Sequence, residues 1–315
     1  MALERPVLSV GDHTYRWCDV VAFARAGGEW DALATTAARR AAAVAAEPDG
    51  DRVAVDRALE EAAIAFRRAR HLLAADELAV WLARWAMTPA EWLACLRGAV
   101  LTDGRGHAPV GTPPSDHAIW VTGVCTGALR TQAARLALGL AARADLGGEG
   151  VTAAAVGDAS TVVALGADLD RYVAARCDDE QLDIEVHNHR LDWTLLNCDV
   201  IVHPREAVLR EVAMCVRHDG VSLAAVAARA GLTTSPVWTR IVDVDPGVRG
   251  FVAAAEPGDV IGPVAVEGSL LLAQVTDRAE PRPSDPDTRA YARAHAARRA
   301  SAIVVTERVI WHDGP

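Results

Sequence analysis

The sequence predicts an α+β fold in which a helical N-terminal part precedes a smaller part that alternates strands and helices. Two segments, 31–46 and 53–75, are rich in alanine and arginine, and their apolar residues recur at helical spacing. Residues 195–202 form an apolar, β-branched run, and residues 270–275 have the pattern of a second strand. At 315 residues, 51% of them apolar, the chain can bury a substantial core and form about two domains.

The N-terminal part is predicted to be helical as far as residue 190. Its first two helices form a hairpin joined by the turn 47–50, Glu-Pro-Asp-Gly. Residues 102–116 are dense in glycine and proline, which predicts an exposed loop. One buried helix is predicted over 118–144, and a further helical pattern covers 151–192.

The C-terminal tail is predicted to form an arginine-rich helix as far as Ala302, followed by a short strand over Ile303–Val305. We therefore expect three parts: a helical domain at 1–190, a strand and helix domain at 191–278, and a C-terminal helix and strand at 279–315.

The second domain has a definite order of elements. The strand 195–202 ends at a His-Pro turn, and residues 205–217 have helical spacing. Ser222 is placed to cap a second short helix, which ends at a glycine. The sequence PGDVIGPV, residues 257–264, then leads into the strand 270–275, which is a hairpin pattern.

This order resembles the parvulin family of peptidyl-prolyl isomerases (PpiC, or SurA type), with PGDVIGPV as its most specific part. Residues 7–23 are similar to the opening of SurA-type chaperones, with a short strand, a turn and a helix. Residues 75–96 look like their two-helix segment, whose second helix starts with Thr88 as its cap and a proline next to it. The resemblance implies a SurA-like helical domain, a parvulin-like α/β domain that binds extended peptide, and a C-terminal segment that packs back on the helical domain.

The parvulin resemblance also implies where chemistry would occur, and here the chain departs from the family. Catalytic parvulins place one histidine in the first strand, one in the last strand, and a cysteine or aspartate between them. The first-strand region of this chain carries Cys198 and Asp199, and the last-strand region carries Leu270 and Leu271. Prolyl isomerisation is therefore expected to be absent or feeble. The candidate catalytic residues that remain are His203, Cys198 and Asp199.

The expected peptide-binding residues are mostly aromatic. Trp81, Trp85 and Trp92 fall at roughly helical spacing and have two interpretations, packing in the core or stacking against a peptide. Trp238 and Leu270 complete this candidate set in the parvulin-like part.

Three further clusters have a functional and a structural interpretation. His187 and His189 would share one face of a strand and could bind a metal, or they could lie at a solvated helix end, and no metal is expected. Cys215 and His218 could pair as thiolate and imidazolium, or serve as a core residue and a helix C-terminal partner. A basic cluster could hold an acidic leader peptide or form a solvated face: Arg67, Arg68 and Arg70.

The composition argues against several classes of binding partner and of chemistry. The net charge of −10 argues against a nucleic-acid partner, and a membrane partner is not expected either. All 32 basic residues are arginine, so Schiff-base chemistry, a P-loop and a lysine base are excluded. The six cysteines lack the close pairs of a disulfide framework, and the N-terminus lacks the pattern of a secretory signal. We expect a cytoplasmic protein without a cofactor.

These observations give three functional hypotheses. The first is a peptide-binding maturation factor of the SurA and parvulin type that acts on a ribosomally made precursor peptide, with other peptide-modifying enzymes as further partners. The second is a stand-alone peptide-modifying enzyme, such as a lanthionine cyclase that adds cysteine thiols to dehydroamino acids, a reaction that needs a base and an acid. The third is an active prolyl isomerase.

Overall fold

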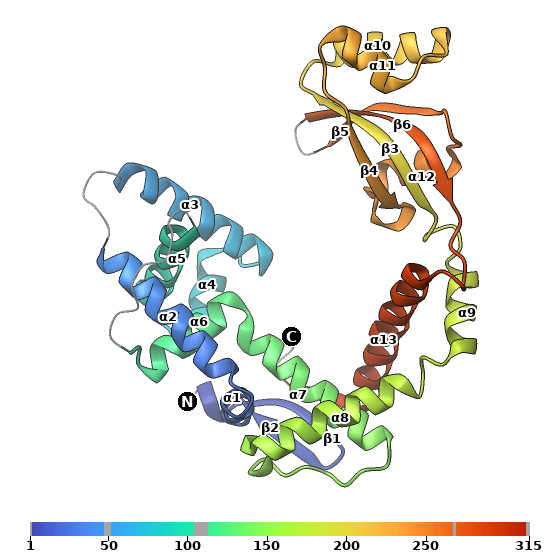
Figure 1. The fold of residues 1–315 in the computed structure, drawn as a ribbon. Helices are drawn as coiled ribbons and strands as arrows, with labels where there is room; N and C mark the ends of the chain where they lie inside the picture. The colour runs from blue at the N-terminus through green and yellow to red at the C-terminus, as the bar shows by residue number, and fades with distance from the viewer. Residues whose placement is uncertain (1, 47–51, 104–112, 267–268, 313–315) are drawn as a thin grey trace. The chain divides into compact units, whose positions relative to one another are not determined.

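The fold combines many helices with two small antiparallel sheets, and it is therefore α+β as the sequence predicts (Figure 1). The computed structural model describes residues 2–46, 52–103, 113–266 and 269–312. The predicted turn 47–50, most of the loop at 102–116 and the tip of the second hairpin lie outside these residues.

The chain divides into two compact units. Unit 1 consists of Met1–Ala175 and Arg299–Pro315, and unit 2 consists of Arg176–Arg298. The sequence predicts boundaries at 190 and 279, inside what the structure assigns to unit 2. The difference arises because α9 (Asp179–Asn188) and α13 (Pro286–Arg308) are joined by hydrogen bonds within unit 2.

Unit 1 is mainly helical. Its elements, besides the end of α13, are η1 (Ala2–Glu4), β1 (Pro6–Val10), β2 (His13–Arg16), α1 (Trp17–Ala26), α2 (Glu29–Ala45), α3 (Arg52–Ala69), α4 (Ala75–Arg84), α5 (Pro89–Asp103), α6 (Asp116–Thr126), α7 (Ala128–Asp145), η2 (Ala155–Gly157), α8 (Ala159–Ala174) and β7 (Val309–Trp311).

Local hydrogen bonds explain where two of these helices start. The Thr88 backbone N–H donates to the Glu91 carboxylate at 2.8 Å, and the Glu91 backbone N–H donates to Thr88 Oγ1 at 3.2 Å. This reciprocal pair is a capping box, as the sequence indicates for α5. Ser115 caps α6 in a simpler way, because its Oγ accepts a bond from the Ala118 backbone N–H.

The prediction of one helix over 118–144 is wrong. α6 ends at Thr126, Gly127 has a φ of 80°, and α7 begins directly after it. A left-handed residue interrupts the hydrogen-bond ladder of a helix, and glycine adopts this conformation without a Cβ clash. The predicted burial is confirmed, since both helices contribute many residues to the core.

A three-stranded antiparallel sheet of order β2-β1-β7 joins the two ends of the described chain. The segment 7–23 thus holds two strands before its helix, where the sequence predicts one. Residues 303–305 are helical, which corrects the predicted strand there. Ala300 and Val304, one helical turn apart, are both buried in the core, so helical spacing suits this segment and the strand β7 begins only at Val309.

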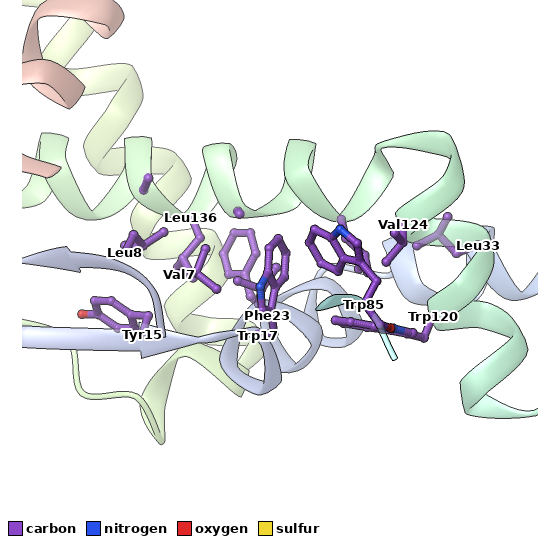
Figure 2. Packing of buried hydrophobic residues seen from close by; sticks show 14 of the residues in the cluster. Val7, Leu8, Tyr15, Trp17, Phe23, Leu33, Trp85, Trp120, Val124 and Leu136 are labelled. Atoms are coloured by element: carbon purple, nitrogen blue, oxygen red, sulfur yellow. The ribbon is translucent and has the colours of Figure 1, made fainter. Parts of the chain in front are cut away.

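Aromatic residues fill the core of unit 1. Figure 2 shows Trp17, Trp85 and Trp120 beside one another, with Phe23 close by. The ring centroids of Trp17 and Trp85 lie 4.9 Å apart, and those of Trp85 and Trp120 lie 5.8 Å apart. The Trp120 indole N–H donates to the Trp85 carbonyl at 3.0 Å, which ties α6 to the end of α4.

Unit 2 contains a sheet with helices on both faces. Its elements, besides α9 and the first part of α13, are β3 (Leu195–His203), α10 (Glu206–Asp219), α11 (Leu223–Ala230), β4 (Ser235–Arg240), η3 (Ile241–Asp243), α12 (Pro246–Ala254), β5 (Val260–Val266) and β6 (Ser269–Ala279).

The sheet of unit 2 has the order β4-β3-β6-β5, and its pairs are antiparallel. The predicted pairing of the segments 195–202 and 270–275 is confirmed, as are the predicted hairpin and the Ser222 cap. The strand β4 and the helix α12 were missed by sequence reasoning. Pro236 within β4 and two glycines within α12 weaken the propensity and spacing patterns that such predictions use.

Each face of this sheet has its own apolar cluster. Ile201 and Leu272 pack against α10 and α11 on one face. Cys198 and Val275 pack with Val252 of α12 on the other (Figure 1). Because the two clusters lie on opposite faces of the sheet, only strand residues that point to the same face can contact one another.

Candidate functional site

The three residues predicted to be catalytic lie on β3, but they do not face the same side. Neighbouring residues of a strand point to opposite faces, so Cys198 faces α12 while Asp199 and His203 face the other side. Asp199 and His203 are separated along the strand by about 13 Å, with the buried Ile201 between them. The structure therefore does not bring this trio together.

His203 closes the strand with a local hydrogen bond. Its Nδ1 accepts from the backbone N–H of Arg205 at 3.0 Å, and Leu270 is its cross-strand partner on β6. Proton exchange at this partly exposed imidazole would therefore use Nε2.

Cys198 has the environment of a structural thiol. It is buried, and this burial raises the pKa of the Cys198 thiol, with a smaller contribution from the negative charge of Asp199. A raised pKa keeps the group protonated near neutral pH, which disfavours a role as nucleophile.

The candidate peptide-binding residues fall into two groups. Trp81, Trp85 and Trp92 are buried in the core of unit 1, which favours the packing interpretation. Leu270 is half-buried against the cluster beneath α10 and α11. Trp238 is different, because it stands on the edge strand β4 and is 57% exposed.

The sheet face that carries Cys198 is only partly covered by α12. Val202 is 61% exposed, and Val237, the cross-strand partner of Cys198, is also exposed. Phe251 projects from α12 with 72% of its surface exposed and lines a cavity of about 700 Å³ beside β5, together with Arg217. Exposed apolar side chains next to a hollow are typical of surfaces that bind partners or ligands.

Unit 1 contains a second candidate site, a cavity of about 480 Å³ between α2, α5 and α6. Its walls are mainly alanine and valine side chains, and its polar groups include Arg40, Cys95 and His117. An apolar pocket with a few convergent polar groups is the usual form of a small ligand or active site.

The electrostatics of this cavity favour a thiolate. A hydrogen bond from Cys125 lowers the pKa of the Cys95 thiol, and the positive charge of Arg40 lowers it further. The Arg40 guanidinium donates to Cys95 Sγ at 3.3 Å. The pKa of Cys125 is raised by its bond to Cys95 and by burial, so the pair shares one thiolate, held on Cys95.

His117 enters the same cavity with a carboxylate partner. Its Nε2 lies 2.8 Å from Glu91 Oε1. Hydrogen bonds from Thr88 and, to a smaller extent, His117 lower the pKa of Glu91 and keep it ionised. An ionised carboxylate that orients an imidazole is an arrangement suited to proton transfer.

Sequence reasoning did not find this cavity. Cys95 was only one of six scattered cysteines, and the groups that surround it come from separate helices. The capping box at Thr88 was the single local signal near the site, since its Glu91 also holds His117.

The other sequence clusters are rearranged by the fold. His187 and His189 do not share a strand, because they lie at the end of α9, where His187 is exposed and His189 approaches Glu185 and His295. Cys215 packs against the apolar cluster of α10 and His218 lies in its last turn, which supports their structural interpretation.

Two of the three arginines in the basic cluster near the end of α3 make contacts within unit 1, and the third, Arg68, is exposed. Arg67 donates to the carbonyls of Leu72 and Leu73. Arg70 donates to the Cys125 carbonyl and lies over the Phe66 ring at 3.7 Å. These contacts favour a structural role over capture of an acidic leader peptide.

No protein-family model matches this sequence, and no curated protein matches it either. The six cysteines are all free thiols. Within the described residues, none of the helices has both the length and the apolar character that crossing a membrane requires.

Proposed function

We propose that this protein is a peptide-binding maturation factor of the SurA and parvulin type, which holds an extended precursor peptide during its modification. The observation that carries the proposal is the open sheet face of unit 2, where Val202 and Val237 are exposed on β3 and β4. Phe251 of α12 is also exposed and lines a cavity beside β5. The chain order of strand, helix pair and final hairpin supports the parvulin resemblance.

The open face suits a peptide in two ways. Its apolar side chains can take alternate side chains of an extended segment, and the edge strand β4 can pair with a further strand. Trp238 follows Val237 on β4 and points to the opposite face, so it adds an aromatic side chain at the edge and not on the open face itself.

Fluorescence anisotropy with fluorescein-labelled peptides of alternating apolar pattern tests this proposal. Burial of an exposed phenylalanine is worth about 2 kcal/mol, so Phe251→Ala is expected to weaken binding about thirtyfold. Met214→Ala, which removes a similarly exposed apolar side chain from α10, is the matched control and should leave affinity unchanged. Equal affinities of both variants and the unaltered protein contradict a peptide site on this face.

A peptide-modifying enzyme is the second candidate, and the cavity in unit 1 favours it. In a thioether cyclisation, His117 would take the proton of a peptide cysteine thiol, and the sulfur would bond to the β-carbon of a dehydroamino acid. The resulting enolate would then receive a proton at its α-carbon, so the addition balances without an oxidant or reductant. Glu91 would hold the His117 ring in place.

Cyclisation leaves the peptide mass unchanged, so the assay counts free thiols. A peptide that contains cysteine and dehydroalanine is incubated with the protein, alkylated and analysed by mass spectrometry, where the cyclised product takes up no alkyl group. His117→Ala should abolish product while peptide affinity is retained, and His218→Ala, at an exposed position in the last turn of α10, should change neither. Full product formation by the His117 variant removes this candidate role.

A further inference from the structure

We propose that unit 2 binds a divalent transition metal, with zinc as the favoured ion, through Glu185, His189 and His295. Glu185 belongs to α9, His189 follows that helix directly, and His295 belongs to the part of α13 within unit 2. Their three ligand atoms lie within 4.8 Å of one another. This site is separate from the peptide-binding face and does not rest on the proposed function.

Two separations within the trio are close to those between ligand atoms of one metal ion, although the shorter of them is also a hydrogen bond. Glu185 Oε2 lies 3.1 Å from His295 Nδ1 and 3.6 Å from His189 Nε2. Charge-assisted hydrogen bonds are shorter, at about 2.7–2.9 Å. In a tetrahedral zinc site with bonds of about 2.0–2.1 Å, two ligand atoms stand about 3.3 Å apart, between the two observed distances.

The chemical types of these three side chains also suit zinc. Two imidazoles and one carboxylate are a recurring set of three protein ligands, with a fourth position left for water or substrate. The Glu185 side chain is only 4% exposed, while the imidazoles remain partly accessible, so an ion could enter from their side.

The surroundings hold the ligands in place. Asp192 Oδ2 lies 3.7 Å from His189 Nδ1, the ring nitrogen opposite the proposed metal ligand. This is an ion-pair separation longer than a hydrogen bond, and it places a carboxylate on the side of the ring where an orienting partner of a zinc-binding histidine usually stands. The Trp193 ring stacks on His189 with an interplanar angle of 14° and meets His295 edge-on, which limits rotation of both imidazoles.

Calorimetric titration of the chelator-treated full chain with zinc chloride, and visible spectroscopy after addition of cobalt(II), test the site. One equivalent of zinc should bind, and cobalt should give the absorption bands of a tetrahedral site. His189→Ala and His295→Ala should each weaken zinc binding more than about a hundredfold, and Asp192→Asn about tenfold. His187→Ala, an exposed histidine in the last turn of the same helix, should bind zinc as the unaltered protein does.

Thermal unfolding with and without zinc separates a metal site from a structural ion-pair cluster. A specific site should raise the Tm of the unaltered protein and of the His187 variant, but not that of the His189 or His295 variants. Should the alanine variants fail to fold, Glu185→Gln and His295→Gln take their place, because they keep side-chain volume. Substoichiometric zinc, absent cobalt bands, or equal zinc affinity in the ligand variants overturns the proposal and leaves a hydrogen-bonded trio that joins two helices.

Discussion

Removal of the Arg40 guanidinium should raise the pKa of Cys95. At the 3.3 Å that separates Arg40 Nη1 from Cys95 Sγ, two unit charges in a medium of effective dielectric near 20 attract by about 5 kcal/mol. Arg40 is partly exposed, so water screens much of this attraction, and Cys125 still donates its hydrogen bond in the variant. We therefore expect Arg40→Met to raise the Cys95 pKa by about one unit, or about 1.4 kcal/mol.

Alkylation by iodoacetamide as a function of pH measures this change. Because only the thiolate reacts, the rate at a pH below the pKa should fall about tenfold in Arg40→Met. Peptide mapping by mass spectrometry assigns the reaction to Cys95 among the six cysteines. Arg39→Met, an exposed arginine one position earlier, is the matched control. An unshifted profile in Arg40→Met refutes the claim that this guanidinium stabilises the thiolate.

Three further predictions follow from the structure. Prolyl isomerisation of a proline tetrapeptide should be absent or feeble in a protease-coupled assay, because the proposed parvulin resemblance places Leu270 and Leu271 where catalytic members carry an imidazole; turnover like that of an authentic parvulin contradicts this. Burial raises the pKa of the Tyr15 phenol to about 12, with a smaller contribution from the negative charge of Asp19. The stabilisation that the neutral phenol provides is therefore present below about pH 10 and is lost as the pH rises through 12. Denaturant unfolding over that range should show the loss in the unaltered protein but not in Tyr15→Phe. Trp85→Ala should lower the free energy of unfolding by about 3–5 kcal/mol, whereas the exposed Trp238→Ala should change it by less than about 0.5 kcal/mol.

Several features of the fold could be predicted because they depend on neighbouring residues. The capping box at Thr88 and the cap at Ser222 use hydrogen bonds between residues three apart, so the sequence displays them directly. The strand β3 follows from a β-branched run, and its pairing with β6 follows from a second, mainly apolar run next to a hairpin.

The two incorrect predictions of helices and strands have different causes. An uninterrupted apolar pattern conceals the left-handed Gly127, since periodicity alone does not tell a helix from two helices joined by one residue. The segment 303–305 consists of β-branched and apolar residues that favour a strand, yet packing of Ala300 and Val304 in the core keeps it helical.

The sequence by itself determined the α+β class, the positions of the main strand pair, and the chemical types excluded by the lack of lysine. Only the tertiary structure decided which reactive groups meet. It placed Cys198 on the opposite face from His203, joined Cys95 to Arg40 from another helix, and brought His295 to Glu185 and His189. The physical reason is range: caps and periodicity act within a few residues, whereas a site depends on distances of a few ångströms between residues far apart in the chain, which core packing fixes.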